Sequence, residues 1–428
     1  MPTLLFYGLF LAVFLGLSDR LSAQESLHLY STQLVPIEEA RRFSQRILSG
    51  FKEGPVQFTP LHQSPFMAAL LREPVAPKGE VDLVAGILLE ELIPLAEKGL
   101  FKPLPELAQR LLERGVPAEL LAEARSGPES PQAILPWMRA TYIMVARRQA
   151  LDYLPKGASL HDLSYEELLL WAKALKEGTG APRLAFPAGE KGLFQILLPG
   201  VILPAFSGGV VNGFARSEAA WDYLQRLWPQ VNPDSTTFNF MQDHLLSGEA
   251  WVAMDHTARL LEVFRTRPGE FVAFPVPRGP KGRYARLTTI GLAVPANAAD
   301  GQRAMRLADF LTTPAVQERL LLEVGFLPVT RLEGEASRGD LAALVAAARS
   351  QNENPATRRV DNPKGLGARE AAFNSVFMAT FSRIVLRGKP ADAVLKEQGE
   401  ALQELYRQND APCVAPDRVG ERPCRITP

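Results

Sequence analysis

The side chains best suited to chemistry gather in one segment, GEAWVAMDHTARLLEVF, at residues 248–264. Asp255, His256 and Arg259 lie where a predicted buried strand gives way to an apolar-periodic segment typical of a helix. A carboxylate, an imidazole and a guanidinium are good hydrogen-bond partners for hydroxyl groups, and the guanidinium can also hold a carboxylate or phosphate through two parallel bonds. A structural alternative stays open, because Asp255 and Arg259 are spaced to form an ion pair at the start of the following helix.

No familiar catalytic motif accompanies this segment. The sequence lacks a Gly-Lys-Ser/Thr phosphate loop, a His-Glu-x-x-His helix, a Gly-x-Ser-x-Gly turn and a Cys-x-x-Cys pair. Its five histidines are scattered. The carboxylate pairs Glu90-Glu91 and Glu166-Glu167 fall in helical contexts, where we expect solvated faces rather than acid/base pairs. The sequence therefore predicts no cofactor and no metal site, and it does not favour an enzyme.

The length and charge of the chain narrow the class of protein. At 428 residues, 46% of them hydrophobic, the chain suits two lobes or domains with sizeable cores. Lys and Arg together number 47, as do Asp and Glu, so there is no bulk positive charge to bind nucleic acid.

The amino terminus reads as an export signal. Residues 4–17 form an uncharged apolar run that is shorter than a bilayer-spanning helix, and LSAQ follows with a small residue at Ala23. This pattern predicts a cleaved signal peptide at residues 1–23 and a protein on the periplasmic or extracellular side of the envelope. No Lys or Arg precedes the apolar run, so an uncleaved amino-terminal anchor is the alternative.

The two cysteines, Cys413 and Cys424, both lie in the proline-rich tail APCVAPDRVGERPC. In an exported chain such a pair favours a disulfide, and no histidine lies nearby to suggest a metal site. Two unpaired thiols are the alternative.

The remaining pattern alternates strands and helices. Strands are expected at 26–30, from Val56 onward and at 81–86, with a helix from Pro36 to residue 47, so the amino-terminal lobe is predicted to be an open parallel sheet. Further helices are predicted at 217–228, 303–311 and 313–324, the last ended by Gly325. The polar stretch from 334 to 369 is predicted to be a loop or linker, and a final helix is predicted at 390–408 with Gly399 as a weak point.

The order of these segments resembles a known family. VDLVAGILLEELIPLAEKGLFKPL (81–104), LPWMRATYIMVARRQAL (135–151) and FMQDHLLSGEAWVAMDHTARL (240–260) carry the likeness, with the stretches 271–329 and 381–405. In this order they resemble the extracellular solute-binding proteins of bacterial ABC transporters, specifically family 1 with the maltose-binding-protein-like carbohydrate binders. The likeness extends over the whole mature chain.

The resemblance implies an α/β fold of the type II periplasmic-binding-protein clamp, in which each of two lobes is a mostly parallel sheet flanked by helices. Lobe one would hold 24–136 and 289–327, and lobe two 137–288 and 328–428. The expected ligand is a sugar or sugar derivative bound between closing lobes and passed to the membrane subunits of an ABC permease, and the expected state is a monomer. A polyamine, an organic anion or, less favoured, a secreted hydrolase are the alternatives.

Candidate ligand-binding residues follow from the predicted strand ends and lobe crossings, because open α/β sheets bind ligands beyond the carboxyl ends of their strands. Besides the three residues of the first segment, the candidates are Tyr30, Gln33, His62, Gln63, Trp137, Thr288 and Thr289. Trp137 could stack on a sugar ring, although packing between the lobes is an equal alternative for it. Sugar-binding relatives commonly have a motif like GPW where this chain has DHTAR, so the usual stacking ring is missing there.

Overall fold

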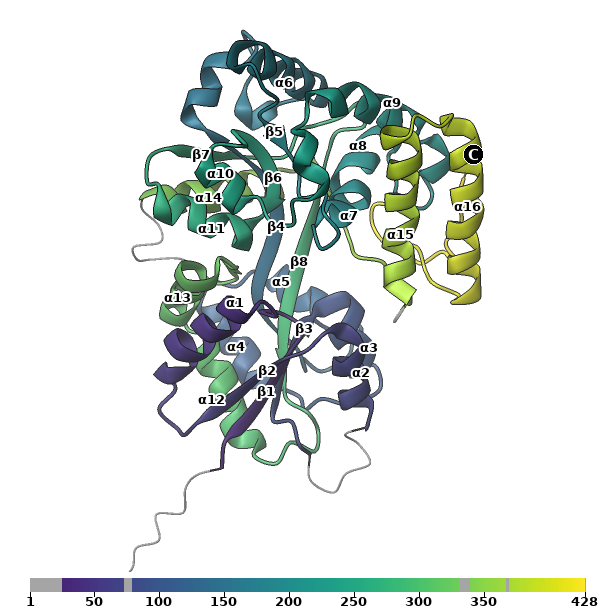
Figure 1. Cartoon of the computed structure of the whole chain (residues 1–428). Helices are drawn as coiled ribbons and strands as arrows, with labels where there is room; N and C mark the ends of the chain where they lie inside the picture. Colours follow the sequence, from purple (N-terminus) through teal and green to yellow (C-terminus); the bar gives the residue numbers. More distant parts are fainter. Residues whose placement is uncertain (1–24, 73–78, 332–338, 367–368, 428) are drawn as a thin grey trace, which may run out of the picture.

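Two long strands run through the molecule and join its two lobes (Figure 1). They are β4 (Leu135–Arg147) and β8 (Arg283–Ala293), which pair antiparallel. The computed structural model describes residues 25–72, 79–331, 339–366 and 369–427, so the predicted signal segment and its cleavage point at Ala23 lie outside the described residues. The lobe boundaries predicted at 136/137 and 288/289 fall within these two hinge strands.

Lobe one is built on parallel strands. β1 (Leu27–Ser31) pairs with β2 (Val56–Pro60) on one side and with β3 (Leu83–Ile87) on the other, and β3 then meets β8 antiparallel. Parallel neighbours need a crossover connection, which the helices between them supply. The helices of this lobe are α1 (Ile37–Arg42), α2 (Gln63–Arg72), α3 (Ile93–Ala96), α4 (Pro105–Glu113), α5 (Ala118–Glu123), α12 (Gly301–Leu311) and α13 (Pro314–Val324).

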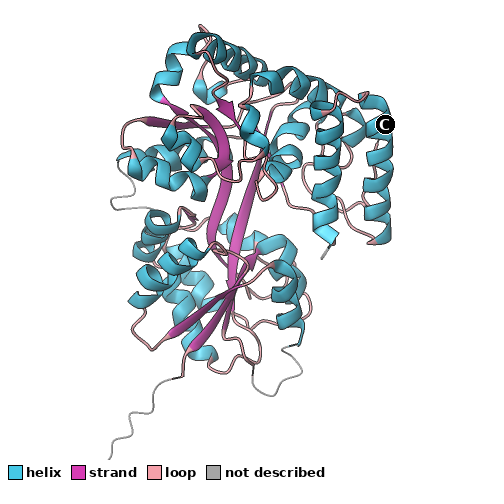
Figure 2. Ribbon diagram, viewed as in Figure 1, coloured by secondary structure: helices cyan, strands magenta, loops and turns pink. Residues whose placement is uncertain are grey.

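Lobe two gathers around the other ends of the hinge strands (Figure 2). β6 (Val252–His256) and β7 (Phe271–Phe274) pair antiparallel with β4, and β5 (Leu184–Ala185) pairs parallel with β6. Short β9 (Leu327–Pro328) pairs with β4 near the crossing. The helices of lobe two are α6 (Tyr165–Thr179), α7 (Phe194–Leu197), α8 (Leu203–Ser207), α9 (Glu218–Leu227), α10 (Gln242–Ser247), α11 (Thr257–Thr266), α14 (Gly339–Asn352), α15 (Glu370–Phe381) and α16 (Ala391–Gln408).

The sheets of both lobes are mixed in direction. The strand order is β2-β1-β3-β8-β4-β6-β5, and the parallel strands at its two ends are separated by the antiparallel hinge pair. The predicted α/β architecture with two lobes is confirmed. No helix within the described residues is long and apolar enough to cross a membrane.

The prediction of a loop at 334–369 is wrong for residues 339–352 and 357–360. α14 occupies 339–352, and β10 (Thr357–Val360) adds a parallel strand to β8. The run LAALVAAAR consists of strong helix formers, and α14 buries Leu344, Val345, Ala347 and Ala348 in a core cluster of lobe two. The alanines gave no clear apolar period, although small side chains can be fully buried in a helix interface.

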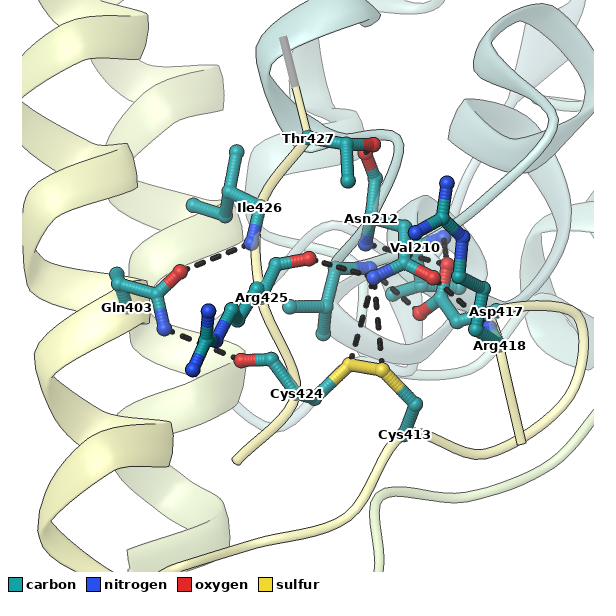
Figure 3. The surroundings of a disulfide bond; sticks show 11 residues. Val210, Asn212, Gln403, Cys413, Asp417, Arg418, Cys424, Arg425, Ile426 and Thr427 are labelled. Atoms are coloured by element: carbon teal, nitrogen blue, oxygen red, sulfur yellow. Dashed lines mark hydrogen bonds between the residues drawn. A yellow bond between two sulfur atoms is a disulfide. The ribbon is translucent and has the colours of Figure 1, made fainter. Parts of the chain in front are cut away.

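The carboxyl-terminal tail folds back onto lobe two (Figure 3). Cys413 and Cys424 form a disulfide with their Cα atoms 4.5 Å apart, and both side chains are buried. The Asp417 carboxylate accepts hydrogen bonds from the backbone N–H groups of Val210, Val211 and Asn212 at 2.8–3.2 Å. α16 continues without a break through Gly399. The side of Gly399 that lacks a side chain faces Phe214 and Ile426.

Candidate functional site

A cleft of about 290 Å³ lies between the lobes, beside the hinge strands. Lobe one contributes the chain after β1, the start of α1 and the end of β3, while lobe two contributes the end of β6, the start of α11, α7 and the start of α15. The polar and charged side chains that line it are Thr32, Gln33, Glu39, Tyr142, His256, Arg259, Arg286, Thr288, Asn362 and Glu370. Of the sequence candidates, the structure therefore brings together Gln33, His256, Arg259 and Thr288.

The floor of the cleft is one face of the hinge pair. Ala140 of β4 lies opposite Thr288 of β8, and both line the cleft together with Tyr142 and Arg286. Because side chains alternate between the faces of a strand, residues two apart on each strand reach the same side. Thr289 points to the other face: it is only 4% exposed and its hydroxyl has no hydrogen-bond partner among the described residues.

His256 presents one nitrogen of a neutral imidazole to the cleft. Its Nδ1 accepts a hydrogen bond from the backbone N–H of Ala258 at 3.3 Å and so caps α11. Burial, and then the nearby Arg259, lower the pKa of His256 to about 3. With Nδ1 acting as acceptor, the proton of the neutral ring resides on Nε2, which is then a donor.

Arg259 forms the lobe-two wall of the cleft and of an adjoining pocket of about 230 Å³. Its guanidinium donates to the Asn239 carbonyl at 3.0 Å and lies 4.3 Å from the centroid of the Phe240 ring. Glu39 faces it from lobe one. Burial raises the pKa of Glu39 to about 7, although Arg259 and Arg42 act in the opposite direction. The two lobes thus present opposite charges across the cleft, with a carboxylate that is easily protonated.

Asp255 serves the fold rather than the cleft lining. It is fully buried, and its carboxylate accepts hydrogen bonds from the backbone N–H groups of Met241 at 3.0 Å and His256 at 2.7 Å. No ion pair between Asp255 and Arg259 forms among the described residues, so the alternative of an i,i+4 pair is not what the structure contains. Desolvation raises the pKa of Asp255.

Replacing Asp255 with alanine is expected to lower the free energy of unfolding by about 1–3 kcal/mol, because two buried N–H groups lose their acceptor. Urea unfolding of the purified variant measures this loss. Asp243→Ala, an exposed carboxylate at the start of α10, is the matched control and should change stability little. Equal stability of the two variants would contradict the capping role.

Trp137 lies in the core of lobe one and not in the cleft. Its side chain has no exposed surface, and its ring packs edge-on against Phe43 at 5.7 Å. This position argues against the predicted stacking on a sugar and also differs from packing between the lobes, because the ring lies within lobe one. Trp137 is the β4 residue at the register shift between Pro136 and Met138, and its side chain belongs to the core cluster of lobe one.

The other predicted residues lie around the cleft or away from it. Tyr30 lines a pocket of about 950 Å³ at the far end of lobe one, next to His28 and Asp82. His62 is exposed and does not line the cleft. Gln63 does not line the cleft itself, but its side chain forms a hydrogen bond with that of Glu370, which does.

The pair Glu90-Glu91 is not a solvated face, which overturns the sequence interpretation. Glu91 is 1% exposed and accepts hydrogen bonds from the Thr32 hydroxyl at 2.7 Å and the Ile87 backbone N–H at 2.6 Å. Burial raises its pKa to about 7. Glu91 thereby fixes the loop after β1 that lines the cleft. Glu166, by contrast, is exposed and pairs with Arg226 at 2.5 Å, as a solvated face would.

Sequence reasoning missed Arg286, Glu39 and Glu370. A signal existed for Arg286, because it lies two positions before the candidate Thr288 and would share its face in a strand. Glu39 looked like one more charge on a helix surface. Glu370 lies far along the chain, and only the packing of α15 against lobe two brings it to the cleft.

Comparisons with known proteins agree with this architecture. A maltose-bound MalE3 from T. maritima superposes with a TM-score of 0.67 at 16% identity, covering 89% of this chain and 99% of that one. UgpB from Mycobacterium tuberculosis in complex with glycerophosphocholine gives a TM-score of 0.63 at 18% identity, covering 90% and 99%. A sugar transporter from Arthrobacter chlorophenolicus A6 with bound laminaribiose gives 0.62 at 15%, covering 89% and 99%. At these identities the likeness shows the fold alone.

The family comparison goes further than the fold. No curated protein matches the sequence. The sequence pattern described as "Bacterial extracellular solute-binding protein", however, matches residues 75–318, which is more than half of the 428 residues and includes both hinge strands and His256 and Arg259. The chain therefore belongs to the bacterial extracellular solute-binding proteins.

Proposed function

We propose that the chain is the solute-binding component of an ABC importer and binds a sugar or sugar derivative in the cleft. The observation that carries this proposal is a single cavity lined by polar groups of both lobes, with Gln33 and Glu39 on one side and Arg259 on the other. Sugar hydroxyls are donors and acceptors, and these side chains offer both partners. The maltose and laminaribiose bound in two structural neighbours support a carbohydrate.

Binding needs no covalent step. The two lobes act as units that meet along the hinge strands β4 and β8, with Trp137 belonging to lobe one. A solute that touches both walls favours the closed state by its difference in affinity for the two states, and the closed form is then recognised by the membrane permease. Gly325 allows the lobes to lie close at the hinge, since a side chain there would meet the backbone of Ala258 at 2.6 Å.

The protein works as a monomer on the periplasmic or extracellular side of the envelope. The apolar segment at 4–17 supports export, and the family description supports an extracellular site of action. A polyamine is a weaker candidate for the solute, because the guanidinium groups of Arg259 and Arg286 in the cleft would repel it.

A thermal-shift screen of sugars and sugar derivatives tests the proposed function. A ligand that binds only the folded chain at a hundred times its Kd adds about 2.7 kcal/mol to the free energy of unfolding and raises the melting temperature. Maltose, laminaribiose and glycerol derivatives should be included. Stabilisation by polyamines or by amino acids alone, with no carbohydrate effect, would reject a sugar as the solute.

Arg259→Ala is expected to weaken binding of the solute found in that screen by roughly tenfold to a hundredfold, because a charged donor to the ligand is lost. Calorimetric titration measures the change. Arg265→Ala is the matched control: it lies on the same helix but is exposed, and it donates to the Leu322 carbonyl away from the cleft. Equal affinity of the two variants would exclude Arg259 from the ligand site.

A further inference from the structure

Arg286 is a buried charge without a partner among the described residues. It is 3% exposed and lines the cleft from β8. Its Nε is buried with no hydrogen bond, and its guanidinium makes no ion pair or hydrogen bond with any residue that the structure describes. The side chain is held in place by its stem, which packs against Gly200, where an added Cβ would lie 3.0 Å from Nε.

The charged groups around Arg286 do not neutralise it by contact. Glu90, Glu370 and Asp361 are close enough to interact with it electrostatically, and Asp361 is already paired with Arg359 at 2.6 Å. Both carboxylate oxygens of Glu90 are buried without a partner in the described structure. The cleft thus holds a buried cation and buried carboxylates that do not touch it.

A buried carboxylate can lose its charge by taking up a proton, but a guanidinium already carries its proton and stays charged. Burial raises the pKa of Glu90 well above its usual value and raises that of Glu370, so both can relieve their desolvation by taking up a proton. An arginine in a protein cannot be deprotonated. A buried charge that stays unpaired is costly, and the open space beside Arg286 is the cleft itself.

Arg259 is the second cation of the cleft and also favours an anionic ligand. Arg259 contributes a guanidinium from lobe two, whereas His256 stays neutral and adds none. Burial favours the uncharged forms of Glu90 and Glu370, and the two guanidinium groups face the same cavity. Guanidinium groups match the planar oxygens of carboxylate and phosphate through paired hydrogen bonds.

We propose that the solute carries an anionic group, a phosphate or a carboxylate, and that Arg286 on the hinge floor binds it. This inference rests on the proposed function, because it places the anion on the solute that the cleft takes. Arg286 lies on one of the two strands that connect the lobes. An anion held there would occupy the hinge side of the cleft, while the remainder of the solute reaches Gln33, Glu39 and Arg259 nearer to the lobe walls.

The test compares anionic probes with their neutral parents on the full mature chain. The pairs are glucose 1-phosphate and glucuronate against glucose, and glycerol 3-phosphate against glycerol, with maltose and laminaribiose as further neutral sugars. Calorimetric titration is expected to show an anionic probe binding at least about tenfold more tightly than its parent, since a charge-assisted pair adds to the hydroxyl contacts.

Three variants separate charge from packing. Arg286→Gln should weaken the anionic probe by about tenfold or more and bring it close to the neutral parent, and Arg286→Lys should restore part of the difference. Arg139→Gln is the matched control, because Arg139 lies on the opposite face of the hinge pair and its Nε likewise has no partner in the described part of the chain. This variant should keep the affinity within about twofold. The melting temperature of Arg286→Gln without ligand should not fall, because the substitution removes an unpaired buried charge.

The outcomes distinguish this inference from the proposed function. Tight binding of glucose, maltose or laminaribiose that Arg286→Gln leaves unchanged would overturn the anion inference and keep the sugar-binding function. Tight binding of glycerol 3-phosphate alone, lost in Arg286→Gln, would support the anion site and reject a sugar as the solute. If no probe of either kind binds, both are rejected. A sharp fall in the melting temperature of Arg286→Gln and Arg286→Lys, with equal losses for anionic and neutral probes, would show a structural role and overturn the inference.

Discussion

Replacing Trp137 with alanine is expected to cost about 3–5 kcal/mol of unfolding free energy, the usual range when a large aromatic side chain is deleted from a core. The ring has no exposed surface, packs against Phe43 and belongs to the core cluster of lobe one. Its Nε1 has no partner among the described residues, so the loss comes from apolar contacts and the cavity left behind. Urea unfolding measures the change.

Trp137→Phe is the graded control, because it keeps an aromatic ring and should recover a large part of the loss. Titration with the solute, at a temperature where Trp137→Ala is still folded, should show nearly unchanged affinity, since the side chain does not line the cleft. A stable Trp137→Ala variant that binds the solute at least about tenfold more weakly would instead restore the stacking role predicted from the sequence.

The sequence predicted the fold best where an apolar pattern agreed with the residues that begin or end a helix or strand. The strand at 27–31 alternates buried Leu27 and Leu29, and α13 begins at Pro314 and ends before Gly325, whose φ of 74° favours glycine. It failed for α14, because alanine is neither clearly apolar nor polar in such patterns. The α14 segment is helical because its residues have high helix propensity, and not because its apolar residues are periodic.

The site was predicted in part, for a reason of distance along the chain. His256 and Arg259 follow a single strand, so the end of that strand could be located from local residues. Glu370 comes to the same cleft only through tertiary packing, whereas Arg286 shares a strand face with the predicted Thr288. Asp255 and Trp137 do not line the cleft, because a polar or aromatic residue near a strand end can point into the lobe as well as out of it. The carboxylate of Asp255 turns inward to the N–H groups before α10 and α11.

Removing the disulfide by the double substitution of Cys413 and Cys424 with alanine is expected to lower the free energy of unfolding by about 3 kcal/mol. The two cysteines are 11 positions apart, so the bridge closes a short loop whose entropy the unfolded chain regains when it is cut. The tail is still tied to lobe two by Asp417, and Gln403 of α16 bonds both the Cys424 carbonyl and the Ile426 N–H (Figure 3). Those hydrogen bonds stabilise the folded state, whereas the disulfide also limits the conformations of the unfolded chain.

Chemical denaturation of the variant and the oxidised wild type gives the difference, and the wild type under reducing agent supplies a second estimate with no substitution. Asp417→Asn separates the two contributions, because it weakens the acceptor for three N–H groups while leaving the loop closed. Its cost should add to that of the cysteine pair if the disulfide acts through the unfolded chain. If the double variant is as stable as the oxidised wild type while Asp417→Asn alone loses stability, the tail is held by its folded-state contacts and the loop entropy contributes nothing measurable.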